Sequence, residues 1–347
     1  MLFGINRVGN FVLQTLFTAL SSLVFFTNKL VSKSSVQAYL SESLASSRLI
    51  AMVKSLLRKP AVDVVNSDYI NYKNAVSELL ESHEKLPQLP AINQEIRQVL
   101  ARPDSSINSL SRVIARDPDL SQLLLRYASS VMMHSHMPPQ SVFDVVRILG
   151  MTQVERITML HAVKALFAGH TQAYTRVFAA SWDRLINKAS MSALIAKKVR
   201  QVAPDHALLG SLLSEVGSLA VLSIFKSSEL PVPNRDTFVS LCREFAKSLG
   251  IALLEKWEMD GDYIQLVRQV GNWQAGEEEP LGLIDIVNLG LYHSLKLRMT
   301  ANRLPPISHL AAYQKLSERY NAVTDTNELE LVVMNRDEIR AIADSLY

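Results

Sequence analysis

Residues 117–128 read DPDLSQLLLRYA, and this segment decides the fold class. Asp117 can accept hydrogen bonds from the unpaired amides at a helix start, and Pro118 fits the first helical position because its missing N–H would be unpaired there anyway. Counted from Leu120, apolar residues recur at offsets of 0, 3, 4, 7, 8 and 11, namely Leu120, Leu123, Leu124, Tyr127, Ala128 and Val131. This spacing predicts a helix that begins after Asp117 and buries one face.

The helical period continues on the carboxyl side of this segment. Ser141 and Asp144 approximate a capping box for a second helix. That helix is expected to end at Gly150, because a glycine commonly follows the last turn. Thr152 and Glu155 match the same box and predict the start of a third helix.

Later segments repeat the same spacing. A stripe of apolar and small residues predicts a long helix over residues 182–199. The segment Ala203–His206 is expected to be a loop, and a further helix is expected over Leu208–Gly217. Alternation with period two appears only around Glu328–Met334, and the tail 308–347 is expected to form two helices. We therefore predict an all-α protein.

The composition of the 347 residues is that of a folded chain, since 48% are hydrophobic, 20% are charged, and only 12 are Gly and 13 are Pro. These values exclude a disordered chain and a collagen-like repeat. Cys242 is the single cysteine. An intramolecular disulfide and a thiolate metal cluster each need at least two sulfurs, so both are excluded and a reducing compartment is expected.

Basic residues gather in the first 60 residues. Seven Lys or Arg against one acid, Glu42, give residues 1–60 a net charge of +6, so residues 61–347 carry −3 of a total of +3. Nucleic-acid binding requires Lys and Arg clustered on the folded surface that meets phosphate. A mildly acidic body does not offer such a surface, and no nucleic-acid partner is expected.

An uncharged stretch of 21 residues lies between Arg7 and Lys29 and is close to the length of a bilayer span. Polar residues recur along it at helical spacing, which favours an amphipathic helix. Three interpretations stay open: a spanning anchor, an interfacial helix over residues 8–33 that meets anionic lipid, and a helix packed on the body. The third is favoured, so a cytoplasmic protein is expected, with association at the inner membrane face as the alternative.

These patterns divide the chain into four segments. Residues 1–35 are expected to form an apolar and basic amino-terminal helix, and residues 36–82 a helical linker in which Pro60 stops the helical pattern. Residues 83–300 are expected to form the main helical domain, and residues 301–347 a helical extension.

The histidines give no sign of a metal centre. They are His83, His134, His136, His161, His170, His206, His293 and His309. His134 and His136 have no further ligand nearby in sequence, and His161 falls beside an apolar stripe, where a partly buried histidine bonded to a neighbour is expected. No phosphate-binding loop, nucleophile elbow or zinc-binding helix motif occurs. No metal and no cofactor is expected.

Four motifs occur along the chain in a characteristic order. They are Leu86-Pro87-Gln88-Leu89-Pro90; Ile114 to Arg126, which contains Asp117-Pro118; Val142 to Leu149-Gly150; and Gly250 to Trp257. In this order they resemble the HDOD family, a helical output domain related to HD-type metal phosphohydrolases and found in bacterial signalling proteins. The resemblance covers about residues 83–300. It implies an HD-domain-like helical bundle, here preceded by the amino-terminal helical arm.

The resemblance includes a departure at the metal centre. Catalytic relatives carry a helix of the form Leu-Leu-His-Asp-Ile-Gly, whose His-Asp pair binds metal, and the corresponding stretch here is Leu212-Leu213-Ser214-Glu215-Val216-Gly217. Ser214 removes the imidazole ligand, and Glu215 alone cannot hold a two-metal centre. Val270-Gly271-Asn272 also lacks the paired histidines that relatives often carry there. The resemblance therefore implies a degenerate site at Ser214 and Glu215. Trp182 is a further candidate residue of the pocket around them.

The expected function is that of a non-catalytic signal-transduction or regulatory module that binds protein partners. Two alternatives stay open. One is a divergent metal-dependent phosphohydrolase that uses Glu215 and distant histidines, and the other is a membrane-tethered, nucleotide-responsive sensor. No residue signature points to a particular small-molecule ligand, and the identity of the protein partner does not follow from the sequence.

Overall fold

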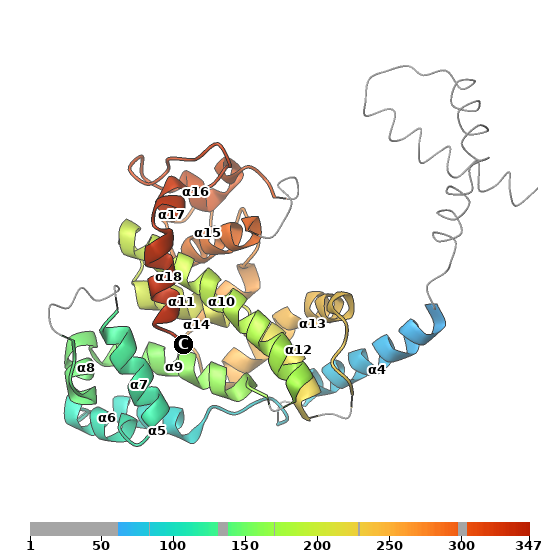
Figure 1. The fold of residues 1–347 in the computed structure, drawn as a ribbon, viewed down its shortest axis with the longest axis horizontal. Helices are drawn as coiled ribbons and strands as arrows, with labels where there is room; N and C mark the ends of the chain where they lie inside the picture. Colours follow the sequence, from blue (N-terminus) through green and yellow to red (C-terminus); the bar gives the residue numbers. More distant parts are fainter. Residues whose placement is uncertain (1–61, 83, 131–137, 170, 228–229, 298–303) are drawn as a thin grey trace, which may run out of the picture. The chain divides into compact units, whose positions relative to one another are not determined.

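Helices make up the regular structure of the described chain (Figure 1). The structure is a computed structural model that describes residues 62–82, 84–130, 138–169, 171–227, 230–297 and 304–347. Within these ranges the only β-type pairing is an isolated antiparallel bridge between Val323 and Leu329. The all-α prediction is therefore confirmed for these ranges. The predicted helix over residues 1–35 and its membrane interpretations lie outside them.

The bounds of the helices set the frame for the site. In chain order they are α4 (Val62–Glu81), α5 (Ala91–Leu100), α6 (Ile107–Ile114), α7 (Pro118–Ala128), α8 (Val142–Leu149), α9 (Met151–Phe167), α10 (Gln172–Val199), α11 (Pro204–Leu213), α12 (Val216–Ser227), α13 (Arg235–Lys256), α14 (Gly261–Gln269), α15 (Leu283–Lys296), the 3₁₀ turn η2 (Ile307–His309), α16 (Ala311–Gln314), α17 (Glu330–Met334) and α18 (Arg336–Asp344). Residues Ser67–Tyr347 form one compact unit.

The helix predicted from residues 117–128 is present as α7. Its cap is the one expected, because the Asp117 carboxylate accepts a hydrogen bond from the Leu120 amide at 2.9 Å. The Ser141 hydroxyl caps α8 in the same way and accepts from the Asp144 amide at 3.1 Å. Gly150 then ends α8 with a φ of 80°. These caps are contacts between near neighbours in sequence, which is why the residue pattern predicted them.

Two helix boundaries differ from the prediction. α9 begins directly after Gly150, whose positive φ turns the chain into the next helix, so Thr152 lies inside α9 and does not cap it. α11 begins at Pro204, which places Asp205 in its first turn rather than in a loop, and it ends at Leu213 instead of continuing to Gly217.

The break after Leu213 bends the chain by 46° before α12. Among the residues that the structure describes, no single helix is both long and apolar enough to cross a membrane, and only α11 and α12 taken together, as a bent pair, meet that requirement.

The carboxyl-terminal tail contains more elements than predicted. The segment Glu328–Met334, which alternates with period two, contains the bridging residue Leu329 and the short helix α17. Three α-helices, α16 to α18, replace the two that were expected. α18 is held to α10 because Lys197 and Lys198 each lie 2.9 Å from a carboxylate oxygen of Glu338.

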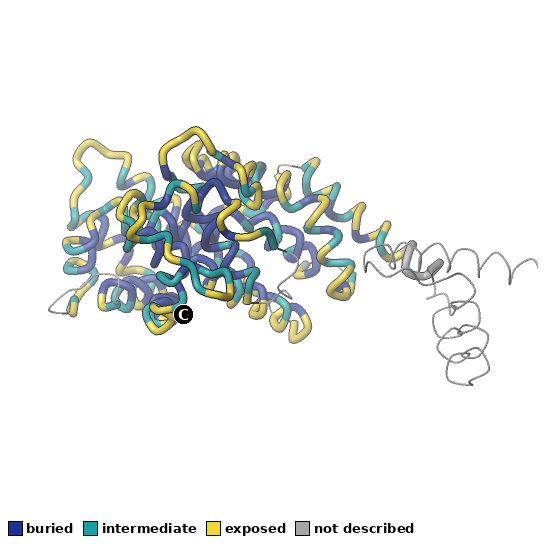
Figure 2. Tube along the Cα trace, turned by 90° about the horizontal axis from the view of Figure 1, so that it is seen from above, coloured by how far each residue is buried: buried dark blue, intermediate teal, exposed yellow. Residues whose placement is uncertain are grey.

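α10 is the helix on which the domain is built. It is 28 residues long, and α11, α15 and α18 all pack on it (Figure 1). Figure 2 shows the buried residues where the described helices face one another and the exposed residues along the outer sides of the helices. α15 lies very close to α10, because a Cβ added at Gly290 would stand 2.1 Å from the Ser192 hydroxyl. α12 meets α13 as closely, since a Cβ at Gly217 would stand 1.8 Å from the Ala246 carbonyl oxygen.

We expect the Gly217→Ala substitution to lower the free energy of unfolding by about 2 kcal/mol or more, because the added methyl group meets backbone that moves only if two helices separate. Denaturant unfolding followed by circular dichroism measures this loss. Gly261→Ala is the matched control, because a Cβ there meets no atom within 4 Å. Equal stability of the two variants would contradict the close contact of α12 and α13.

His293 makes stability depend on pH. Its side chain on α15 is 1% exposed, and neither ring nitrogen has a hydrogen-bond partner in the described chain. Burial, with a smaller contribution from Lys296, lowers the pKa of His293 to about 4. In the unfolded chain the pKa returns to about 6.5. The unfolded state therefore binds more protons between these values, and stability is lost as the pH falls from about 6.5 to about 4.

We expect this loss to reach about 3 kcal/mol at pH 4 and to be removed largely by His293→Leu. Unfolding free energies measured at intervals from pH 7.5 to pH 4 test it. The same substitution at the exposed His309 is the control and should leave the pH dependence in place. A profile unchanged by His293→Leu would show that other groups cause the loss.

Candidate functional site

The break between α11 and α12 presents the two residues predicted from the HD-like motif. Ser214 follows the last residue of α11, and its hydroxyl donates to the Ser211 carbonyl oxygen at 2.7 Å. Glu215 is the next residue, and its side chain is 25% exposed. Because α12 starts only at Val216, both side chains lie at a bend rather than along one continuous helix.

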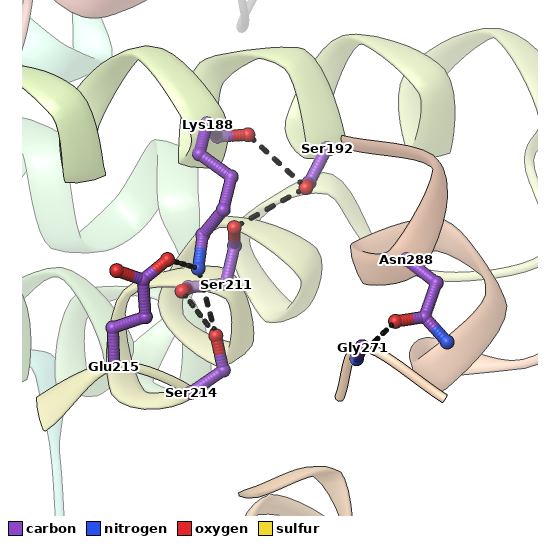
Figure 3. Close-up of polar contacts among 7 residues, drawn as sticks. All are labelled: Lys188, Ser192, Ser211, Ser214, Glu215, Gly271 and Asn288. Atoms are coloured by element: carbon purple, nitrogen blue, oxygen red, sulfur yellow. Dashed lines mark hydrogen bonds and ion pairs between the residues drawn. The ribbon is translucent and has the colours of Figure 1, made fainter. Parts of the chain in front are cut away.

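The side chain that joins them comes from α10. Lys188 is 1% exposed, and its Nζ donates to Glu215 Oε1 at 2.5 Å and to Ser214 Oγ at 2.9 Å (Figure 3). A lysine ammonium offers three donors and no lone pair, so the carboxylate and the hydroxyl both serve it as acceptors. Ser214 and Glu215 are thus brought together, and the group between them is a cation belonging to the chain.

Burial governs the charge of this group. It lowers the pKa of Lys188, the Glu215 carboxylate counteracts that decrease, and nearby Arg184 adds to it. A buried ammonium without a counter-charge would lose several kcal/mol of hydration, so the contact with Glu215 is what makes its position on α10 tolerable. The pair is therefore a condition for packing α10 against the α11–α12 bend.

Small polar residues fill the space beside the lysine. The Ser192 hydroxyl donates to the Lys188 carbonyl oxygen at 3.1 Å and lies 3.3 Å from the Ser211 hydroxyl (Figure 3). Ser192 is also the residue that Gly290 of α15 approaches. α10, α11 and α15 consequently meet around one short stretch of α10.

Asn288 of α15 holds the turn at Gly271 and Asn272. Its Oδ1 accepts from the Gly271 amide at 2.9 Å, and its Nδ2 donates to the Asn272 carbonyl oxygen at 3.0 Å. Gly271 has a φ of 83°, which suits glycine. Asn288 is 3% exposed, and both polar atoms of its amide bond to this turn.

Trp182, the third predicted residue, lies away from the pair. It stands six residues before Lys188 on α10, which corresponds to about 9 Å along the helix and a different side of it. Its ring stacks on Phe178 at 5.9 Å between centroids, and Lys164 Nζ lies 5.9 Å from the ring centre. Trp182 was predicted to lie with Ser214 and Glu215, but the contacts of its ring are with Phe178 and Lys164.

The scaffold residues predicted from the resemblance hold distant segments together. The Trp257 indole donates to the Pro87 carbonyl oxygen at 2.9 Å, and Lys256 donates to the Leu86 carbonyl oxygen at 2.7 Å. The end of α13 thereby fixes the Leu-Pro-x-Leu-Pro segment. Asp117 and Pro118 begin α7, while Leu149 is buried and Gly150 links α8 to α9.

The remaining titratable residues do not assemble a metal site. In the described ranges no three His, Cys, Asp or Glu side chains gather as metal ligands would. His161 Nδ1 is buried without a hydrogen-bond partner, so the expectation that a neighbour satisfies this histidine is wrong for that nitrogen. His83, His134, His136 and His170 lie outside the described residues.

Cys242 does not supply a thiolate. Burial raises the pKa of its thiol to about 11, so the protonated form dominates at neutral pH.

Sequence reasoning missed two partners of the site, Lys188 and Asn288. Lys188 had a signal, because it lies three residues after Leu185 and four before Ser192, on a side of the predicted helix that is otherwise apolar or small. A lysine in such a position needs a buried acceptor. Asn288 had none, because only the fold brings it to Gly271.

Comparison with known proteins assigns the family. The HDOD domain profile matches residues 86–272, which is more than half of the chain. This protein belongs to the HDOD family. No curated protein sequence matches it.

Two solved structures share its fold. The first, from Shewanella amazonensis SB2B, is named "Putative metal-dependent phosphohydrolase"; it has a TM-score of 0.65 and 21% identity and covers 81% of this chain and 100% of its own. The second is an HDOD domain protein of unknown function from Geobacter sulfurreducens, with a TM-score of 0.52 and 18% identity, covering 80% and 98%. At these identities the likeness concerns the fold alone.

We expect the Lys188→Met substitution to destabilise this HDOD protein by about 3 kcal/mol, because Glu215 and Ser214 lose their buried donor. Glu215→Gln should lower the free energy of unfolding less in the Lys188→Met variant than in the native chain. The double-mutant cycle should therefore give a coupling energy of about 1 kcal/mol or more. Urea unfolding of the four proteins measures it. The exposed pair Lys73–Glu244 is the control and should couple more weakly. Additive effects at Lys188 and Glu215 would contradict the contact.

Proposed function

We propose that this chain is a non-catalytic signal-transduction or regulatory module that acts through protein–protein interaction on an HDOD scaffold. The observation that carries the proposal is the Lys188 ammonium between Ser214 and Glu215. In the HD-like motif the two corresponding side chains would bind a metal ion. In this chain the Ser214 hydroxyl and the Glu215 carboxylate bind the Lys188 ammonium instead.

The residues present do not fit a metal centre. A serine hydroxyl is a poor ligand, and Glu215 is the one carboxylate of the motif and already binds Lys188. A divalent cation beside the ammonium would also be repelled by it. For these reasons the site supports a structural role, in which the former metal position is a fixed ion pair that holds α10 to the α11–α12 bend.

The alternative is a divergent metal-dependent phosphohydrolase, the activity that the name of the Shewanella structure suggests for that protein. It would require Glu215 to leave Lys188 and to find further ligands. Membrane tethering through residues 8–33 remains a separate hypothesis about location, and it does not affect the chemistry of the pair.

We expect the purified full chain, incubated with Mn²⁺ and then desalted, to retain no stoichiometric metal and to hydrolyse bis(p-nitrophenyl) phosphate no faster than the Glu215→Gln variant. Elemental analysis and absorbance of nitrophenolate measure the two quantities. Glu244→Gln, at an exposed glutamate, is the control for nonspecific effects. Bound metal together with turnover that only Glu215→Gln abolishes, with the fold intact, would establish the phosphohydrolase instead.

A second experiment identifies the protein partner that the proposal requires. Cross-linking and affinity capture from the native host, carried out with the full chain and with a version lacking residues 1–35, should recover the same stoichiometric protein partner. Recovery of the short version from the soluble fraction alone, with loss of the full chain's membrane fraction, would assign location to the arm. Failure of either version to form a defined complex would contradict action through protein binding.

A further inference from the structure

A pocket of about 320 Å³ lies between α7, α9 and the segment that follows α18. Its polar side chains are Asp119, Gln122 and Arg126 from α7, His161 and Lys164 from α9, and Tyr347. Gln122 and Arg126 lie on α7 and His161 and Lys164 on α9. The two residues on each helix are three or four positions apart and so share one helix face. Lys188, Ser214 and Glu215 are not among the residues that line it, so this pocket is distinct from the ion pair described above.

Two nitrogen atoms at this pocket are buried and have no hydrogen-bond partner among the residues that the structure describes. They are Arg126 Nε and His161 Nδ1. Buried polar groups in folded proteins are nearly always paired, so these two atoms from neighbouring helices leave polar positions at the pocket for a bound group.

The charge at the pocket is mainly positive. Within the described ranges neither Arg126 nor Lys164 forms an ion pair, and burial together with the Arg126 guanidinium lowers the pKa of Lys164. The Lys164 ammonium lies 5.9 Å from the Trp182 ring centre and 5.4 Å from that of Tyr347. Ring faces attract a cation but accept no conventional hydrogen bond from it. Asp119 is the one carboxylate among the lining side chains, and it is exposed at the rim.

We propose that this pocket binds a small organic phosphate, a phosphate monoester attached to a planar, apolar group. Arg126, Lys164 and His161 offer donors from two helices, which suits the three terminal oxygens of a monoester better than the two of a carboxylate. The rest of the lining is apolar, with Leu123, Leu160 and Leu346 beside the Tyr347 ring, and can cover the organic part. The volume suits a ligand of that size.

Such a ligand would add a charged link between α7, α9 and the segment after α18. The phosphate would neutralise the repulsion between Arg126 and Lys164, and thereby hold α7 to α9. The Tyr347 hydroxyl donates to Asp183 Oδ1 on α10 at 2.6 Å, so the segment after α18 links the pocket to the central helix. The site thus provides an input to the module that is independent of the Lys188–Glu215 pair.

The test is calorimetric titration of the full native chain with phenyl phosphate, benzoate and inorganic phosphate at low ionic strength. Phenyl phosphate is expected to bind most tightly. Arg126→Gln and Lys164→Gln should each weaken its binding about tenfold or more, because each removes a charge-assisted hydrogen bond. Arg112→Gln, the same substitution at an exposed arginine of α6, is the control and should bind like the native chain.

Tryptophan fluorescence tests whether phenyl phosphate binds at this pocket. Because Lys164 lies over the Trp182 ring, phenyl phosphate should change the emission of the native chain, and Trp182→Phe should lose that change while keeping the calorimetric heat. Thermal melting of each variant checks that it is folded. No binding by the native chain, unchanged binding by a folded Arg126→Gln variant, or benzoate binding as tight as phenyl phosphate would each overturn the proposal.

Discussion

A charged side chain can be buried only with a partner, and Lys188 imposes that constraint on the centre of this protein. Its ammonium lies between Ser214 and Glu215, so the bend between α11 and α12 has to bring both acceptors to one level of α10. One turn further along α10, Ser192 receives Gly290 of α15 without an intervening side chain. The positions of four helices therefore follow from contacts within about one turn of α10.

The same constraint gives the site its chemical character. In an HD-like metal centre the protein supplies lone pairs and the metal supplies the positive charge. In this chain α10 supplies the positive charge as the Lys188 ammonium, and Ser214 and Glu215 accept its hydrogen bonds. A centre of this kind stabilises one arrangement of helices, which is the basis for proposing a regulatory scaffold rather than an enzyme.

Prediction from the residue pattern succeeded where a structure depends on near neighbours. The caps at Asp117 and Ser141 are examples, because donor and acceptor lie within three residues. It failed at Thr152, since the unusual φ of Gly150 begins α9 without a cap. It also extended α11 past Leu213, because apolar spacing continues through Val216 although the chain bends. Trp182 was grouped with Ser214 as a candidate site residue, whereas the packing of α9 on α10 brings it to Lys164.

The sequence by itself determined the all-α class, the starts of α7 and α8, and the absence of His-Asp at Ser214-Glu215, because these depend on residue identity and short-range spacing. Only the tertiary structure decided that Lys188 donates to Ser214 and Glu215, that Asn288 fixes Gly271, and that Arg126 and His161 meet at one pocket. The physical reason is distance along the chain. A hydrogen bond or ion pair between residues tens of positions apart exists only after packing has brought their helices together, and no local period encodes that packing.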